Sequence, residues 1–234
     1  MEYRKVSIVI PIYNERGTIE QVLNQVRQAE VLGLEKEIIL IDDNSTDGTK
    51  EFLRNLNDSS LKIIFQDTNQ GKGAALHTGF ATATGDIAVI QDADLEYDPA
   101  EIAKVLEPIV KSNAQVVYGS RYLNPRQALG FWHSFFNKLF TNFGNILIGQ
   151  KITDLMTCYK AFSREVLDQI TPRLESERFG FEPEVTAKVS RLGYKIIEVP
   201  ISYQPRSKHQ GKHMNFQGQI ESLWALLKYT LIKK

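Results

Sequence analysis

The segment DIAVIQDADLE, residues 86–96, is an apolar, β-branched run that leads directly into three closely spaced carboxylates. Apolar runs of this length are typical of parallel strands that are covered on both faces. Segments 6–14, 37–45, 62–67 and 114–121 have the same character. Helical spacing of apolar residues separates these segments, so strand and helix alternate five times. The alternation predicts an α/β fold with an open, mostly parallel sheet flanked by helices. A sixth strand-like segment, 194–203, follows in the second half of the chain.

The acidic residues lie where such a sheet binds ligands, which is beyond the carboxyl ends of its strands. If the strand continues through residue 94, Asp92 and Asp94 share one face of it, because side chains two residues apart point the same way. Paired carboxylates suit a hard cation such as Mg²⁺ or Mn²⁺. A solvated acidic turn would have the same local sequence, so the surrounding motifs have to decide between the two interpretations.

Composition limits the possible functions. The chain has 234 residues, and its 28 basic and 28 acidic residues give a formal net charge of zero, which argues against nucleic acid as a partner. The single cysteine, Cys158, and the absence of an apolar signal-peptide core at the start favour a cytoplasmic location. Because no run of about 18 apolar residues occurs, we expect a soluble or membrane-surface protein rather than one that spans the bilayer.

Four motifs occur in a fixed order: IVIPIYNE (8–15), LIDDNSTDGT (40–49), NQGKGAALHTGFATATGD (69–86) and QDADLE (91–96). Together they resemble the inverting nucleotide-sugar glycosyltransferases of family 2, whose fold is called GT-A. The resemblance is strong over about residues 5–125 and implies one GT-A domain over 1–234, with a nucleotide-sugar-binding half (1–125) and an acceptor half (126–234).

The resemblance also implies roles for individual residues. It places Asp92, Asp94 and Glu96 around a Mg²⁺ or Mn²⁺ ion that bridges the donor diphosphate. Many relatives that use lipid acceptors have glutamine where Glu96 stands, so this chain carries an additional negative charge. The residues that it implies for the nucleoside pocket are Pro11, Tyr13, Glu15 and Asp42.

The glycines at 71 and 73 surround Lys72, but they lack the spacing of a P-loop or of a complete dinucleotide fingerprint. We therefore interpret Gly71 and Gly73 as turn and close-packing residues. Lys72 is a candidate contact for the donor phosphate. The missing fingerprint also argues against a dehydrogenase.

An aromatic amphipathic segment, GFWHSFFNKLFTNFGNILIG (130–149), predicts a helix with one broad apolar stripe. Its pattern fits either a core helix or a helix that inserts at a membrane surface. The resemblance to the polyprenyl-phosphate branch of the family favours the membrane surface. The segment IESLWALLKYTLIKK (220–234) repeats the pattern, so we expect amphipathic interfacial helices in the second half.

The two possible acceptors make different chemical demands. A lipid phosphate is already largely ionised at neutral pH, so it needs cations to dock it rather than a general base. The basic residues proposed for docking are Arg121, Arg206, Lys208 and Lys212. A hydroxyl acceptor would need a base, and the resemblance offers Asp154 as that base or as an acceptor-orienting group.

The sequence thus predicts a metal-dependent inverting transferase that moves a hexose from a UDP- or GDP-sugar to a dolichyl or undecaprenyl phosphate. It would act peripherally at the cytoplasmic face of a membrane, on its own or held by a membrane-protein partner. One alternative is a transferase of the same fold that acts on a soluble sugar or polysaccharide hydroxyl. Another is a non-catalytic, membrane-associated nucleotide-sugar binder.

Overall fold

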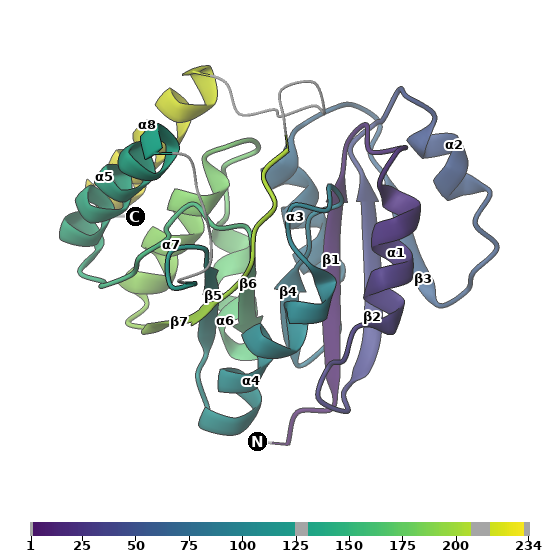
Figure 1. Cartoon of the computed structure of the whole chain (residues 1–234), viewed down its shortest axis with the longest axis horizontal. Helices are drawn as coiled ribbons and strands as arrows, with labels where there is room; N and C mark the ends of the chain where they lie inside the picture. Colours follow the sequence, from purple (N-terminus) through teal and green to yellow (C-terminus); the bar gives the residue numbers. More distant parts are fainter. Residues whose placement is uncertain (1, 125–130, 207–215, 232–234) are drawn as a thin grey trace.

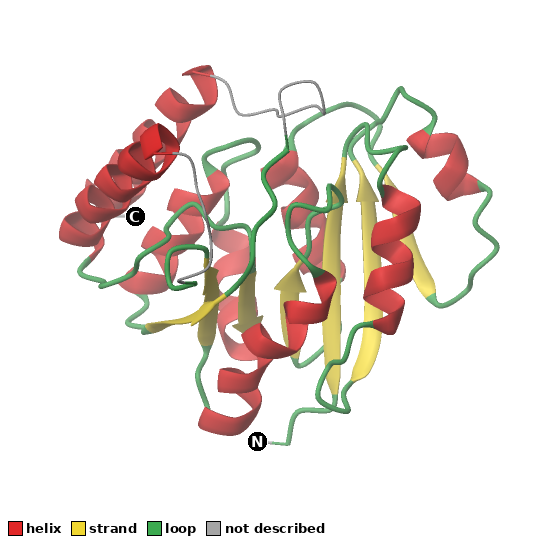
Figure 2. Cartoon of the chain, viewed as in Figure 1, coloured by secondary structure: helices red, strands yellow, loops and turns green. Residues whose placement is uncertain are grey.

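A seven-stranded sheet runs through the molecule (Figures 1 and 2), and the computed structural model describes residues 2–124, 131–206 and 216–231. The strand order is β3-β2-β1-β4-β6-β5-β7, and only β6 runs antiparallel to its neighbours. The strands are β1 (Lys5–Ile12), β2 (Glu35–Asp42), β3 (Leu61–Phe65), β4 (Ile87–Ile90), β5 (Val116–Ser120), β6 (Lys160–Ser163) and β7 (Ile196–Pro200).

Helices cover both faces of this sheet. Their bounds are α1 (Ile19–Gln28), α2 (Thr49–Arg54), α3 (Lys72–Thr82), α4 (Ile102–Ser112), α5 (Phe131–Ile148), α6 (Arg164–Ile170), α7 (Phe181–Arg191) and α8 (Phe216–Leu231), with short 3-10 turns at η1 (Pro99–Glu101) and η2 (Thr171–Arg173). Apolar residues of α1 and α4 form the core on one face, and those of α3, α6 and α7 form the core on the other. The two cores explain why the central strands are apolar at nearly every position.

Strand β1 contributes apolar side chains to both cores. Val6, Ile8 and Ile10 belong to the core beneath α1 and α4, while Val9 packs on the opposite side with α3. Gly79 of α3 allows this close packing, because a Cβ at that position would collide with Val9. Alternation along the strand therefore fixes its register between the two helix layers.

Glu37 links three segments near the amino-terminal end of the sheet. Its buried carboxylate accepts hydrogen bonds from Ser7 of β1, from Lys62 of β3, and from both the amide and the hydroxyl of Thr84. Burial raises the pKa of Glu37, but these hydrogen bonds outweigh burial and hold the pKa well below its usual value. The ionised carboxylate therefore stabilises the folded sheet.

Helices α5 and α8 form an outer layer against α7, and Figure 1 shows them side by side at the upper left. The layer leaves large apolar side chains exposed, so the predicted stripe is not simply a core helix. The exposed residues are Phe135, Phe136, Leu139, Phe143 and Ile146 of α5, and Ile220, Leu223, Trp224 and Leu231 of α8. Among the helices that the structure describes, none combines the length and apolar character needed to cross a bilayer.

The mostly parallel sheet and its flanking helices confirm the predicted fold class, with two differences in detail. Strand β6 was not predicted, because it has only four residues and includes a buried lysine, Lys160. The predicted strand at 86–94 was too long: β4 ends at Ile90, so Asp92 and Asp94 lie in the turn that follows. Strand alternation therefore does not explain how these two carboxylates are placed.

Candidate active site

A cavity of about 920 Å³ opens at the carboxyl ends of β1, β2 and β4 and extends to helices α5 and α8. Its lining combines two kinds of surface. Charged side chains come from the strand ends, from the start of α3 and α7, and from loops; they are Glu15, Asp43, Lys72, Asp92, Asp94, Glu96, Arg121, Arg178, Glu182 and Arg206. Apolar side chains come mainly from the outer helices; they include Phe136, Leu139, Phe140, Phe143, Met156 and Leu223.

A tight turn after β4 arranges the acidic motif. Leu95 adopts a left-handed backbone conformation, with φ of 62°, and the amide of Glu96 donates a hydrogen bond to Asp94 Oδ1 over 3.0 Å. Burial, followed by the charges of Asp92 and Glu96, raises the pKa of Asp94 to about 7. The turn thus concentrates more negative charge than it can stabilise by itself.

Arg206 supplies one of the neutralising charges. Its Nη1 lies 3.0 Å from both carboxylate oxygens of Glu15, and its Nη2 lies 2.9 Å from Asp94 Oδ2. Its backbone amide donates to Glu96 Oε1 over 3.0 Å, and Tyr203 donates to the other oxygen of Glu96 over 2.8 Å. Residues far apart in the sequence therefore enclose one guanidinium group among three carboxylates.

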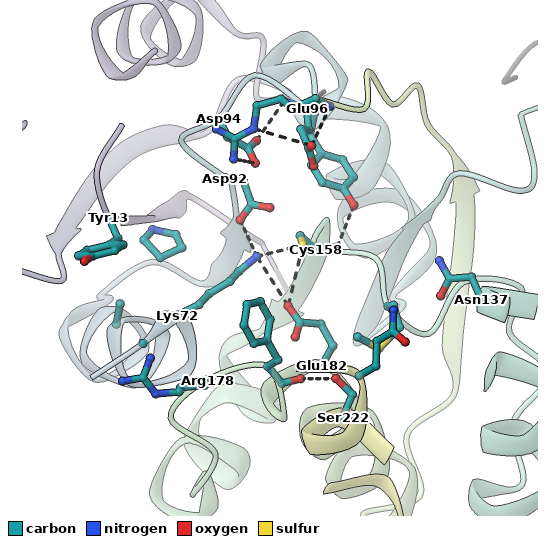
Figure 3. A pocket seen from close by; sticks show the side chains of 18 of the residues that line it. Tyr13, Lys72, Asp92, Asp94, Glu96, Asn137, Cys158, Arg178, Glu182 and Ser222 are labelled. Atoms are coloured by element: carbon teal, nitrogen blue, oxygen red, sulfur yellow. Dashed lines mark hydrogen bonds and ion pairs between the residues drawn. The ribbon is translucent and has the colours of Figure 1, made fainter. Parts of the chain in front are cut away.

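Lys72 neutralises the remaining aspartate. Its Nζ lies 2.7 Å from Asp92 Oδ1, 2.9 Å from the thiol of Cys158 and 3.6 Å from Glu182 Oε1. Figure 3 shows the side chain of Lys72 directed toward these three groups. Burial lowers the pKa of Lys72, but the charge of Asp92 and its other anionic neighbours raises it well above its usual value. Lys72 is therefore a permanently charged group at the floor of the cavity.

The donor set fits a divalent ion in its chemistry but not in its present arrangement. Asp92, Asp94 and Glu96 offer hard oxygens and a surplus of negative charge. In the described part of the chain, however, no three acidic, histidine or cysteine side chains converge as a metal site requires. Arg206 and Lys72 instead bind these carboxylates.

The geometry does not support the predicted role of Asp154 as a base. Asp154 is fully buried and is not among the residues that line the cavity. Its two oxygens accept hydrogen bonds from Arg121 Nε and Nη2, each over 2.7 Å, and Oδ2 also accepts from the backbone amide of Arg121 over 3.1 Å. Asp154 therefore positions Arg121, which itself reaches the cavity wall and packs against the ring of Tyr203.

The residues proposed for the nucleoside divide into two groups. Pro11, Tyr13 and Glu15 line the cavity. Burial raises the pKa of Glu15, although the charge of Arg206 acts to lower it. Asp42 does not line it: the side chain is fully buried, and its Oδ2 accepts a hydrogen bond from the amide of Ser45 over 3.2 Å. Proposed residues Lys208 and Lys212 lie outside the described residues.

Asp43 lines the cavity where Asp42 does not. Its carboxylate accepts hydrogen bonds from the amides of Gln70 and Gly71 over 2.8 and 2.7 Å. It thereby holds the loop that leads into Lys72. The resemblance implied Asp42 of this pair for the nucleoside pocket, whereas the structure places Asp43 in the cavity lining.

The close-packing interpretation of the two glycines is confirmed. A Cβ on Gly71 or Gly73 would lie closer than 3.0 Å to the backbone of segment 176–177, so a side chain at either position would displace that segment. The same segment brings Arg178 and the start of α7 to the cavity. The sequence predicts Glu182 in the first turn of a helix, with only a secondary role beside the acceptor, and it gives no signal for Arg178. Long-range packing places both residues at the cavity.

Comparisons with known proteins agree with this geometry. The profile of Glycosyl transferase family 2 matches residues 7–171. A dolichol-phosphate mannosyltransferase of Pyrococcus furiosus is 31% identical over 216 residues, which are 89% of this chain and 59% of that protein. An undecaprenyl-phosphate mannosyltransferase of Micrococcus luteus is 30% identical over 218 residues, which are 89% of this chain and 87% of that protein.

A solved structure shows the same fold. The glucosyl-3-phosphoglycerate synthase of Mycobacterium tuberculosis, in complex with Mn²⁺, UDP and glucosyl-3-phosphoglycerate, superimposes with a TM-score of 0.72 at 22% identity. The match covers 99% of this chain and 81% of that one. Fold, motifs and relatives therefore agree that this chain belongs to glycosyltransferase family 2 and has the GT-A fold.

Proposed function

We propose that the protein transfers a hexose, with inversion, from a UDP- or GDP-sugar to a polyprenyl phosphate. The observation that carries this proposal is one cavity with a charged end at the sheet and an apolar wall on two helices that expose aromatic residues. A nucleotide sugar needs the first surface, and a lipid-linked acceptor needs the second. The relatives named above, which act on lipid phosphates, support this choice of acceptor.

In the proposed reaction, an oxygen of the acceptor phosphate attacks C1 of the sugar. The bond between C1 and the terminal phosphate oxygen of the donor breaks, and its electron pair leaves with the nucleoside diphosphate. Because the acceptor oxygen is already ionised at neutral pH, no side chain has to remove a proton. This agrees with the buried, fully bonded state of Asp154.

Cations have two tasks in this scheme. Arg121 uses Nε and Nη2 to bind Asp154, and we propose that its Nη1 faces the acceptor phosphate. A Mg²⁺ or Mn²⁺ ion held by Asp92, Asp94 and Glu96 would stabilise the charge on the departing diphosphate. Arg206 would have to leave these carboxylates, and it would then be available to the phosphates.

The membrane is the proposed location of the acceptor. The exposed apolar side chains of α5 and α8 adjoin the cavity wall, so a bilayer surface would cover them while the lipid phosphate enters the site. We propose peripheral attachment at the cytoplasmic face through this surface.

A transfer assay tests the proposed function. Labelled UDP-glucose, UDP-galactose and GDP-mannose would be supplied with Mg²⁺ or Mn²⁺ and a short-chain polyprenyl phosphate, with the matching polyprenol as the acceptor control. We expect labelled lipid with the phosphate only, and no product from Asp94→Ala. The exposed variant Asp67→Ala serves as the matched control and should retain activity. Transfer to soluble hydroxyls but not to the lipid phosphate would refute the proposal.

A further inference from the structure

Glu182 is a cavity residue to which the scheme above gives no task. It lies in the first turn of α7, and only 6% of its side chain is exposed. The turn is rigidly held, because its neighbours Phe181 and Pro183 are both buried. Figure 3 shows the Glu182 carboxylate directed toward Lys72 and Cys158 at the floor of the cavity.

The carboxylate of Glu182 lacks close hydrogen-bond donors. Among the residues that the structure describes, its contacts are Lys72 Nζ at 3.6 Å and the Cys158 thiol at 3.9 Å. Lys72 makes its close contact with Asp92 instead, at 2.7 Å. A nearly buried carboxylate without close donors is costly, so its position is best explained by a ligand that supplies them.

Glu184, on the same turn, shows what a purely structural carboxylate looks like. It is fully buried and accepts hydrogen bonds from the amides of Glu175 and Ser176, each over 2.7 Å, as well as from Lys188. Groups of the protein therefore supply hydrogen-bond donors to the Glu184 carboxylate, whereas the Glu182 carboxylate faces the cavity.

The chemistry around Glu182 limits the kind of ligand that can bind against its carboxylate. Lys72 lies near both Asp92 and Glu182, and the charge of the buried Lys160 also acts on Glu182, but neither ammonium group donates a close hydrogen bond to it. A phosphate placed against Glu182 would be repelled, whereas a neutral polyhydroxyl group would donate hydrogen bonds to it. The donor of the proposed reaction carries one such group, its sugar.

We propose that Glu182 accepts hydrogen bonds from hydroxyl groups of the sugar that is transferred, and that it thereby helps to select that sugar. The inference rests on the proposed function. It assigns Glu182 to the hexose, and it leaves the nucleoside diphosphate to the carboxylates and cations around Asp92 and Asp94.

Binding measurements without an acceptor test this role. Affinities for UDP, GDP, UDP-glucose and GDP-mannose would be determined by calorimetry for the wild type and for Glu182→Gln. We expect the variant to bind the nucleoside diphosphates within about twofold of the wild type and the preferred nucleotide sugar about tenfold more weakly, because a neutral amide oxygen is a weaker acceptor than a carboxylate. Glu177→Gln, which alters an exposed carboxylate outside the cavity lining, is the matched control.

Deoxy-sugar donors identify the hydroxyl. The analogue that lacks the contacted hydroxyl should bind the wild type more weakly, and it should cause a smaller loss in Glu182→Gln. Three results would overturn the inference: equal losses for the nucleoside diphosphate and the nucleotide sugar, no loss for either, or no contribution of the sugar to binding in the wild type. Failure of every nucleotide to bind would instead refute the proposed function.

Discussion

Replacing Asp154 with asparagine separates a structural role from a catalytic one. The substitution keeps the shape of the side chain but leaves the buried guanidinium of Arg121 without a counter-charge at two contacts of 2.7 Å. The two side chains are 0% and 6% exposed, so solvent does little to compensate. Breaking a buried ion pair in this way costs about 3–5 kcal/mol. At roughly 2–4 °C per kcal/mol for a chain of this size, Tm should fall by about 6–20 °C.

The assay combines thermal and denaturant unfolding with binding of UDP and GDP at a temperature where the variant remains folded. Asp168→Asn is the matched control, because its partner Arg164 is 3.5 Å away and its side chain is 64% exposed. That exposed pair should contribute less than about 1 kcal/mol. The reasoning is refuted if Asp154→Asn keeps the wild-type Tm and nucleotide affinity but loses transfer, because Asp154 would then have a catalytic rather than a structural role.

Three further predictions address the other charged and close-packed positions. Arg206→Gln removes a cation that competes for the acidic cluster, so Mn²⁺ should bind about tenfold more tightly in the absence of the nucleotide sugar. Paramagnetic resonance of free Mn²⁺ measures the affinity, and unchanged or weaker Mn²⁺ binding contradicts the prediction. Gly73→Ala should destabilise the fold by about 1–3 kcal/mol in urea unfolding, because its Cβ would collide with the backbone of Ser176, whereas Gly17→Ala, with nothing within 4 Å, should not. The depressed pKa of Glu37 stabilises the folded state above the unfolded pKa of 4.5, and this contribution is lost as pH falls toward the folded pKa. Urea unfolding of Glu37→Gln should therefore depend less steeply on pH between about 5 and 3 than that of the wild type, and parallel profiles would exclude this role.

Local sequence patterns were sufficient to predict most of the strands and helices of the fold. Apolar β-branched runs separated by helical spacing identified six of the seven strands, because burial on both faces demands apolar residues at successive positions. Strand β6 was missed because four residues with a lysine among them carry no such pattern. Lys160 is tolerated there because its ammonium group reaches the carbonyls of Leu155 and Thr157.

By itself, the sequence determined the family, the fold class and most of the side chains that line the charged end of the cavity. Motifs at strand ends made this possible, since parallel strands bring their carboxyl ends to one edge of the sheet. Only the tertiary structure decided which charges pair. Arg206 forms an ion pair with Glu15, which is 191 residues away in the sequence. Asp154 is buried against Arg121, so it is not exposed to a substrate. Such contacts depend on how distant segments pack, so the availability of a carboxylate for a ligand, as at Glu182, follows from the fold and not from its neighbours in the chain.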